Sequence, residues 1–307
     1  MEQASNSPHP DPYHFYNKVG CPKYFVAPMV DQSELPYRML TRKYGAHICY
    51  TPMFHARLFG TEEKYRKEMF KPCKEDRPLV VQFCANDPDV LLRAAKFVEN
   101  DCDAVDINLG CPQGIAKKGN YGSFLLEKTE LIVSMVTKLR ENLKVPVTCK
   151  IRCLPTEEQT LHLAKEIEKA GASLLTVHGR TRDHNKQTVG PANYSIIRKI
   201  KQTLSIPVIA NGGISNFDDV EAALKFTGCD GVMSSEGILE YPALFDPSTV
   251  HDMDKLIQEY LEMYEKYPYE GGVKTVKAHL NKFMHAGFVA QGHSDLREKL
   301  NKPNPAM

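Results

Sequence analysis

The chain has 307 residues, 42% of them hydrophobic, and a formal net charge of +1. This length suits one large domain with a small second one, and the balanced charge excludes a uniformly basic surface for nucleic acid, so any such surface must be local. No apolar run approaches the about 20 residues that a membrane span needs, and we expect no membrane association.

Residues 1–20 are polar and lack both the apolar core of a signal peptide and the arginines of a transit peptide, so we predict a flexible N-terminal tail. The nine cysteines are an odd number and are scattered along the chain. This favours a reducing compartment, the cytoplasm with the nucleus as a second location, over a disulfide framework. Cys149 and Cys153 flank a strand end, but no second pair stands at zinc-like spacing, and no metal site is predicted.

Eight short apolar segments follow one another along the chain, with helical segments between them. The predicted strands are Tyr24–Met29, His47–Thr51, Leu79–Cys84, Ala104–Leu109, Val147–Ile151, Leu174–His178, Val208–Ala210 and Gly231–Ser234. Such near-continuous apolar strands indicate a parallel sheet buried on both faces. Eight units over roughly 225 residues match a TIM (β/α)8 barrel, predicted here over residues 21–248. The rival is a doubly wound open sheet, but no G-x-G-x-x-G follows any strand.

The strand–helix alternation stops near residue 250, and we predict a small helical domain over residues 249–307. Its expected helices are Asp254–Lys266, Val273–Met284 and a short third at Ser294–Asn301. The polar side of the second carries Lys274, Lys277 and His285 with Lys282 at its margin, and no acid occurs between residues 271 and 294. This side is either a solvated helix face or a phosphate-contacting surface. Charge alone favours the solvated face, because three lysines are a weak indication of nucleic-acid binding.

Residues 104–123, AVDINLGCPQGIAKKGNYGS, are the most informative segment. They indicate a buried strand that delivers Asn108 and Cys111 to a mobile glycine-rich loop at its C-terminal end, where the chemistry of TIM barrels is located. Gln82 is an amide inside an apolar strand and must find partners. Lys150 lies on a barrel-facing strand, which is unfavourable unless it is paired, and Arg152 points the same way. For both cations a structural ion pair is an equally good interpretation.

The pattern D-x-N-x-G-C-P followed by K-K-G-x-x-G-S closely resembles the signature of the tRNA-dihydrouridine synthases, flavin enzymes that reduce the 5,6 double bond of uridine in tRNA. The run H-G-R-T-R with a later G-x-A also resembles this family, and the likeness spans roughly residues 23–245. The opening APMVDQSELPYRML most resembles the eukaryotic branch that modifies positions 20a and 20b of the tRNA D-loop.

This resemblance implies that FMN is bound and reduced by NADPH or NADH, that hydride passes from FMN N5 to uracil C6, and that Cys111 donates the proton to C5. At Ser235 and Glu236 the family usually carries Gly-Arg or Ala-Arg, so backbone donors are expected to bind the phosphate there, with the carboxylate turned outward. The implied cofactor contacts are Pro28, Met29, Val30, Gln82, Asn108, Lys150, His178, Asn211, Gly212, Gly213, Ser235 and Glu236. The predicted tRNA contacts are Arg152, Arg180, Arg182 and, from the polar side of the second C-terminal helix, Lys274, Lys277, Lys282 and His285; for Arg180 the cofactor phosphate is the alternative.

Two other functions stay open on the sequence. One is a flavin oxidoreductase for free pyrimidines, similar to the dihydroorotate dehydrogenases, although a free base needs no helical domain with an acid-free face. The other is an RNA-binding barrel without catalytic activity. Cys111, Lys150 and Gln82 argue against that second function, whereas Glu236 mildly favours it. The sequence does not indicate a protein partner.

Overall fold

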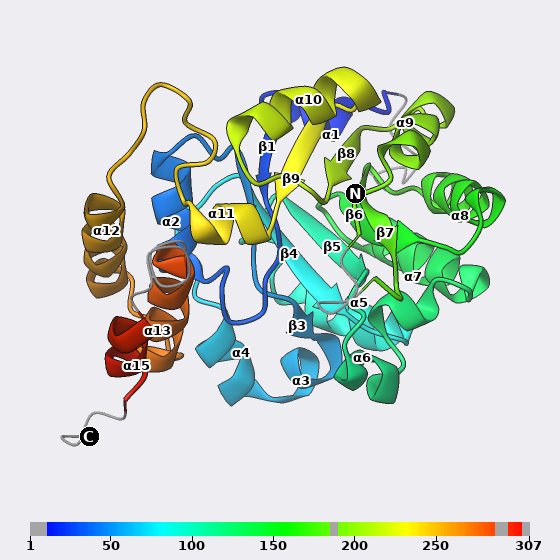
Figure 1. The fold of residues 1–307 in the computed structure, drawn as a ribbon. Helices are drawn as coiled ribbons and strands as arrows, with labels where there is room; N and C mark the ends of the chain where they lie inside the picture. The colour runs from blue at the N-terminus through cyan, green and yellow to red at the C-terminus, as the bar shows by residue number, and fades with distance from the viewer. Residues whose placement is uncertain (1–10, 185–189, 286–293, 303–307) are drawn as a thin grey trace.

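The computed structural model describes residues 11–184, 190–285 and 294–302. In this part of the chain eight parallel strands close a barrel: β1 (Tyr24–Val26), β2 (Ile48–Tyr50), β4 (Leu79–Cys84), β5 (Ala104–Leu109), β6 (Val147–Cys153), β7 (Leu174–Thr181), β8 (Val208–Asn211) and β9 (Gly231–Ser234). Neighbours follow the order β2-β1-β9-β8-β7-β6-β5-β4, and a β2–β4 pairing closes the ring. The short β3 (Phe54–His55) pairs with the end of β4. The predicted TIM barrel is confirmed (Figure 1).

Helices surround this barrel and connect its strands: α2 (Leu35–Lys43), α3 (Ala56–Thr61), α4 (Glu63–Met69), α5 (Pro88–Lys96), α7 (Thr129–Asn142), α8 (Glu157–Lys169), α9 (Tyr194–Thr203), α10 (Phe217–Thr227) and α11 (Glu236–Glu240). Several begin at side chains that bind free backbone N–H groups. Thr156 and Asn216 form capping boxes with Gln159 and Asp219, and Asp87 caps α5. Such caps satisfy donors that the first helical turn leaves unpaired.

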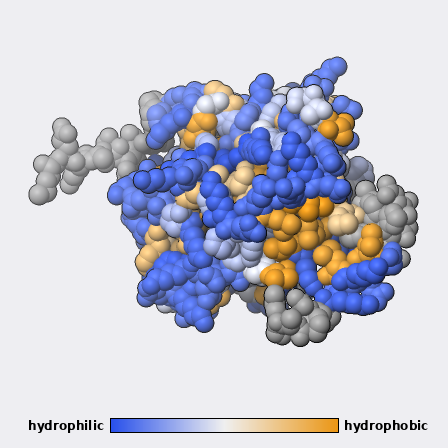
Figure 2. Space-filling view, turned by 90° about the vertical axis from the view of Figure 1, so that its left-hand side faces the viewer, coloured by the Kyte–Doolittle hydropathy of each residue, from blue (hydrophilic) through white to orange (hydrophobic). Residues whose placement is uncertain are grey.

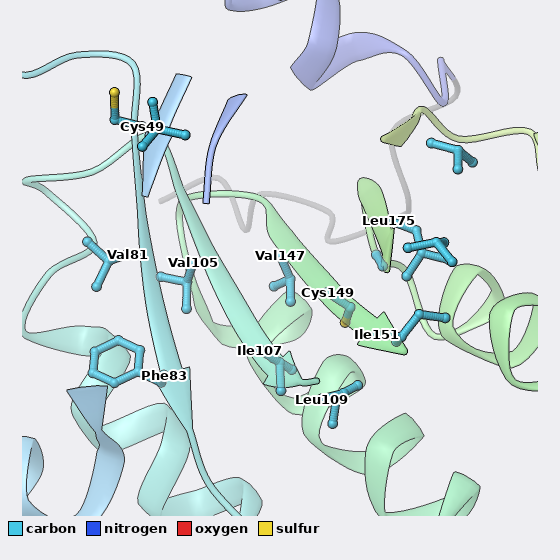
Figure 3. Packing of buried hydrophobic residues seen from close by; sticks show 14 of the residues in the cluster. Cys49, Val81, Phe83, Val105, Ile107, Leu109, Val147, Cys149, Ile151 and Leu175 are labelled. Carbon is cyan, nitrogen blue, oxygen red and sulfur yellow. The ribbon is translucent and has the colours of Figure 1, made fainter. Parts of the chain in front are cut away.

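Alternating strand residues build two separate cores. Val81, Val105, Ile107 and Leu175 face the helices, and Figure 3 shows them projecting from neighbouring strands. The intervening residues fill the barrel interior, where Val80, Ala104, Leu174, Ile209 and Met233 form an apolar cluster. This follows from the period of two along a strand. Further along the same strands the inward positions become polar, which places the polar layer toward the C-terminal end of the barrel.

A short helix, α1 (His14–Lys18), closes the N-terminal end of the barrel. Phe15 and Tyr16 are buried and belong to the interior cluster, and the Tyr16 hydroxyl donates to the backbone oxygen of Asp230 over 2.8 Å. The predicted tail over residues 1–20 is therefore wrong for residues 11–20, because two aromatic side chains there have apolar surface to bury. Residues 1–10 lie outside the described residues.

The C-terminal helices α12 (Met253–Lys266), α13 (Gly272–Phe283) and α15 (Ser294–Asn301) lie at one side of the barrel, next to α2 (Figure 1). Their bounds agree with the sequence-based ones to within a residue. Leu256, Tyr260 and Phe283 are buried in the same cluster as the helix-facing barrel residues. Figure 2 looks onto this side of the molecule and shows an apolar area within a mostly hydrophilic face. No helix among the described residues is long and apolar enough to cross a membrane.

Candidate active site

A chain of hydrogen bonds runs through the polar layer of the barrel to the loop after β5. Gln82 Nε2 donates to Asp106 Oδ2 over 2.8 Å, and Asn108 Nδ2 donates to Gln82 Oε1 over 2.8 Å. Asn108 Oδ1 in turn accepts the backbone N–H groups of Gly110 and Cys111, at 3.1 and 3.0 Å. The β4–β5 register places Gln82 beside Asp106, so this chain depends on strand pairing as well as on the sequence of one strand.

Asp106 determines which atom of each side chain donates in this chain of hydrogen bonds. An ionised carboxylate only accepts hydrogen bonds, so the amide nitrogen of Gln82 turns toward Asp106 and its oxygen is left for Asn108. The oxygen of Asn108 then faces the Cys111 backbone. Burial raises the pKa of Asp106 to about 6, opposed by hydrogen bonds from Thr148 and Gln82 and by the charge of Lys150. Asp106 had no predicted role, although an acid at the inward position directly before Asn108 was a visible signal in the sequence.

The loop that carries Cys111 contains two short helices. Its residues form α6 (Gly114–Gly119) and a 3₁₀ helix, η1 (Gly122–Leu125). The Ser123 backbone N–H and hydroxyl both donate to the Cys111 backbone oxygen, at 3.0 and 2.9 Å. Gly122 has a φ of +64°, and a Cβ there would lie 2.7 Å from the same oxygen. A glycine is therefore required, and Cys111 is held half-buried by contacts on both sides.

Lys150 and His178 project into the barrel from β6 and β7. Burial, together with the nearby Arg152, lowers the pKa of Lys150 to about 8, while Asp106 and Cys111 act in the opposite direction. Among the described residues, none accepts a hydrogen bond from Lys150 Nζ. Burial and the neighbouring positive charges of Lys150, Arg152 and Arg180 lower the pKa of His178 far below its usual range, so its ring is neutral. A neutral ring nitrogen can accept from the Arg180 guanidinium, which lies 3.2 Å from Nε2.

Two glycines follow β8 at the same end of the barrel as Lys150 and His178. Gly212 and Gly213 have φ angles of +105° and +75°, and a Cβ on Gly212 would lie 2.8 Å from His178 Cδ2. The Asn211 amide nitrogen donates to the Met233 backbone oxygen over 2.8 Å. Its oxygen is buried and accepts no hydrogen bond from any described residue. The end of β8 therefore combines a glycine turn with a buried acceptor that has no donor among the described residues.

The remaining predicted cofactor contacts lie after β1 and β9. Pro28, Met29 and Val30 follow β1, and Val30 is 49% exposed. Ser235 precedes α11, and the Glu236 side chain is exposed and pairs with Lys282 of α13. The carboxylate is thus directed to the C-terminal helices, in line with the outward orientation expected from the sequence. Because parallel strand ends converge, the structure brings all the predicted cofactor residues to one end of the barrel.

The three predicted arginine contacts bind neighbouring loops. Arg152 Nε donates to the Gly110 oxygen over 2.8 Å, and Arg180 Nε donates to the Gly190 oxygen over 2.7 Å. Arg182 donates to the Ser123 oxygen and pairs with Glu127, both over about 3 Å. In this structure these guanidinium groups hold the loops after β5 and β7 together. Contact with RNA stays a prediction for each of them.

The predicted basic face of α13 is partly engaged within the protein. Lys277 Nζ donates to the Lys302 backbone oxygen over 2.8 Å, and Lys282 pairs with Glu236. Lys274 and His285 are exposed. Elsewhere in the described ranges, no three His, Cys, Asp or Glu side chains are grouped as a metal site would require.

Comparison with known proteins identifies the family. Residues 25–302 match the model of a family described as dihydrouridine synthase (Dus). A Schizosaccharomyces pombe tRNA-dihydrouridine(16/17) synthase [NAD(P)(+)] is 47% identical over 299 residues, which cover 93% of this chain and 74% of that protein. The mouse protein of the same name, with the suffix "-like", is 46% identical over 94% of this chain, which spans 61% of that protein's length.

The branch expected from the sequence is not confirmed. A human protein named tRNA-dihydrouridine(20a/20b) synthase [NAD(P)+]-like is 42% identical over 222 residues, or 71% of this chain and 69% of its own length. The relatives named for positions 16 and 17 match at higher identity and over more of the chain. The expectation depended on one short segment, APMVDQSELPYRML, whereas these identities are counted over most of the chain.

Proposed function

The chain belongs to the dihydrouridine synthase family, and we propose that it is an NAD(P)H-dependent oxidoreductase that reduces uridine to dihydrouridine in tRNA. The observation that carries this proposal is the hydrogen-bonded chain from Asp106 to the backbone of Cys111, at the end of the barrel where Lys150 also lies. It places a thiol and a buried ammonium group at one site.

We propose FMN as the cofactor, and two features of the structure fit it. The Lys150 ammonium group lies in the barrel without a hydrogen-bond partner among the described residues, and the buried Asn211 oxygen lacks a donor there. A flavin carries both an electron-rich ring edge and N–H donors, which these groups would bind. Gln82, Met29 and the glycine turn after β8 would complete the site. When bound, the flavin would accept hydride from NAD(P)H and pass hydride to uracil C6.

The residues of this chain would then position the base and supply the proton. A base that is stacked in folded tRNA must first be unstacked, at roughly a few kcal/mol. The Cys111 thiol would donate its proton to C5 as a general acid, held in place through its backbone by Asn108 and Ser123. Lys150 would supply positive charge beside the cofactor ring, which favours its reduced, anionic form. Because the described fold contains one barrel, NAD(P)H and RNA would use the same face in turn.

We propose positions 16 and 17 of the D-loop as the target, supported by the relatives named for these positions. Mapping dihydrouridine in tRNA from cells that lack this protein tests the assignment. Loss at positions 16 and 17 is the expected result, and loss at 20a and 20b alone would return the target to the branch expected from the sequence.

The activity itself is tested on the purified protein. We expect a yellow protein whose cofactor, released by heat, has the mass of FMN, and whose NADPH-reduced form is reoxidised by tRNA that lacks dihydrouridine. FAD or no flavin would contradict the cofactor assignment. Reoxidation by free uracil or orotate but not by tRNA would instead support the free-pyrimidine enzyme, and no reoxidation by either would support the inactive barrel.

A further inference from the structure

A buried carboxylate joins the two main C-terminal helices to the barrel. Glu34 lies immediately before α2 and is 1% exposed. Its Oε1 accepts the hydroxyl of Tyr260 on α12 over 2.9 Å, and its Oε2 lies 3.0 Å from Nε2 of His279 on α13. The His279 ring is fully buried and stacks on Tyr37, with the ring centres 4.4 Å apart. One side chain from the barrel thus contacts both helices.

Joining helices through buried polar groups costs more free energy than joining them through apolar side chains. Removing a carboxylate and an imidazole from water is unfavourable, and the Nδ1 atom of His279 has no hydrogen-bond partner among the described residues. Glu34 occupies the N-cap position of α2, yet its side chain does not cap that helix. Polar contacts of this kind fix one geometry, because their hydrogen bonds are lost on a small shift that apolar packing would tolerate.

The contact continues from Glu34 into the loop after β1. The neighbouring Ser33 hydroxyl accepts the Met29 N–H over 3.0 Å and lies 3.1 Å from the Met29 oxygen, to which it donates. Arg38 holds the Ser33 backbone oxygen over 2.6 Å, and Arg38 is itself paired with the buried Asp76. The segment from Met29 to Glu34 is therefore one braced turn, with a proposed flavin contact at one end and α13 at the other.

A second link joins α13 to the loop after the adjacent strand. Lys282 of α13 pairs with Glu236, which follows β9. The register pairs Val26 of β1 with Ser234 of β9, so both links lie beside each other at the C-terminal end of the barrel. The helix that carries the exposed Lys274 is thus attached at the loops after two neighbouring strands.

We propose that Glu34 and His279 are positioning residues that set where a tRNA held on the C-terminal helices meets Cys111. The inference rests on the proposed function, because it concerns the uridine-reduction step of that site. Neither residue needs to touch the base. A displacement of the C-terminal helices by about 1 Å can cost on the order of 10²-fold in rate when reacting groups must be aligned.

The test compares Glu34→Ala with Glu259→Ala in the full-length, flavin-loaded protein. Glu259 is a matched control, because it also joins α12 to the α2 region, through the Tyr44 hydroxyl at 2.6 Å and Lys43 at 3.0 Å, but at the opposite end of α2. Three quantities are measured: the rate of flavin reduction by NADPH, the Kd for tRNA without dihydrouridine, and the single-turnover rate at which saturating tRNA reoxidises the flavin.

For Glu34→Ala we expect reoxidation by tRNA to slow by about tenfold or more, while flavin reduction and the tRNA Kd change by less than about twofold. Glu259→Ala should change none of the three by more than that. An unchanged reoxidation rate in Glu34→Ala, or equal slowing in both variants, would overturn the inference. If Glu34→Ala does not fold, Glu34→Gln is tested in its place. Slower reoxidation is again expected, and an unchanged reoxidation rate would contradict the inference. Wild-type protein that is not reoxidised by tRNA would refute the proposed function instead.

Discussion

The stability of Asp106→Asn relative to wild type should increase from acidic to alkaline pH. In the folded protein the pKa of Asp106 is about 6, against an ordinary value of 3.8, and burial is the main cause. Between these values the folded state keeps a proton that the unfolded state has lost. The free energy of unfolding therefore falls as the pH rises through this range. An asparagine carries no charge, and its amide can still bond both Gln82 and Thr148.

The size of the effect follows from the pKa difference. A rise of about two pH units corresponds to roughly 3 kcal/mol between the fully protonated and the fully ionised limits. Only part of this range is crossed between pH 4.5 and pH 8, so the stability of Asp106→Asn relative to wild type should improve by about 2 kcal/mol between the two. Urea unfolding at each pH measures this difference, and all other titrating groups cancel to first order.

Asp76 provides a control whose carboxylate titrates below this pH range. It is also buried, which by itself raises its pKa, but Arg38 and Arg42 outweigh burial and hold the pKa of Asp76 below its usual value. The stabilisation by the Asp76 carboxylate is therefore lost only as the pH falls below about 3.8, so the stability of Asp76→Asn relative to wild type should be nearly equal at pH 4.5 and at pH 8. If the relative stability of Asp106→Asn is likewise the same at both pH values, the carboxylate of Asp106 is not destabilised by burial, contrary to the prediction.

Three further predictions concern the proposed reaction. Cys111→Ala should keep its flavin and the reduction of that flavin by NADPH, but should lose about 10²–10⁴-fold in dihydrouridine formation, and near-normal formation would make the thiol structural. Lys150→Ala should weaken FMN binding to the apoprotein and slow flavin reduction, whereas normal affinity and rate would assign Lys150 to a structural role. In Lys274→Ala/Lys277→Ala, tRNA binding should weaken and the slope of log K against log salt should shrink by about 0.7–0.9 per lost phosphate contact, while an unchanged slope would indicate a solvated helix face.

Most of the fold could be predicted from the sequence because each barrel strand is a short apolar run that is buried on both faces. The bounds of β4, β5 and β9 agree with the predicted ones at both ends. Helix α1 was not predicted, because Phe15 and Tyr16 are buried only where the barrel leaves an opening at its N-terminal end. That opening is produced by all the strands together, so no local pattern around residue 15 could reveal it.

Sequence patterns point to side chains that follow a strand end, and less well to side chains that depend on pairing between strands. Cys111 and Asn211 were predicted as site residues from their places at strand ends, and the structure brings both to the same end of the barrel as Lys150. Asp106 was missed because its partners, Gln82 and Thr148, lie on other strands and are brought to it by register alone.

The acid-free stretch of α13 shows why charge counted along a sequence says little about charge in space. Between residues 271 and 294 no acid occurs, which makes the helix look available to phosphates. In the structure its two acidic partners come from elsewhere: Glu236 is 46 residues from Lys282, and Glu34 is 245 residues from His279. Glu236, whose charge seemed unsuited to a phosphate-binding loop, forms an ion pair with Lys282. The ion pair with Glu236 removes Lys282 from the free basic surface and also attaches the helix to the end of β9, so the exposed Lys274 lies on a helix that is held against the barrel.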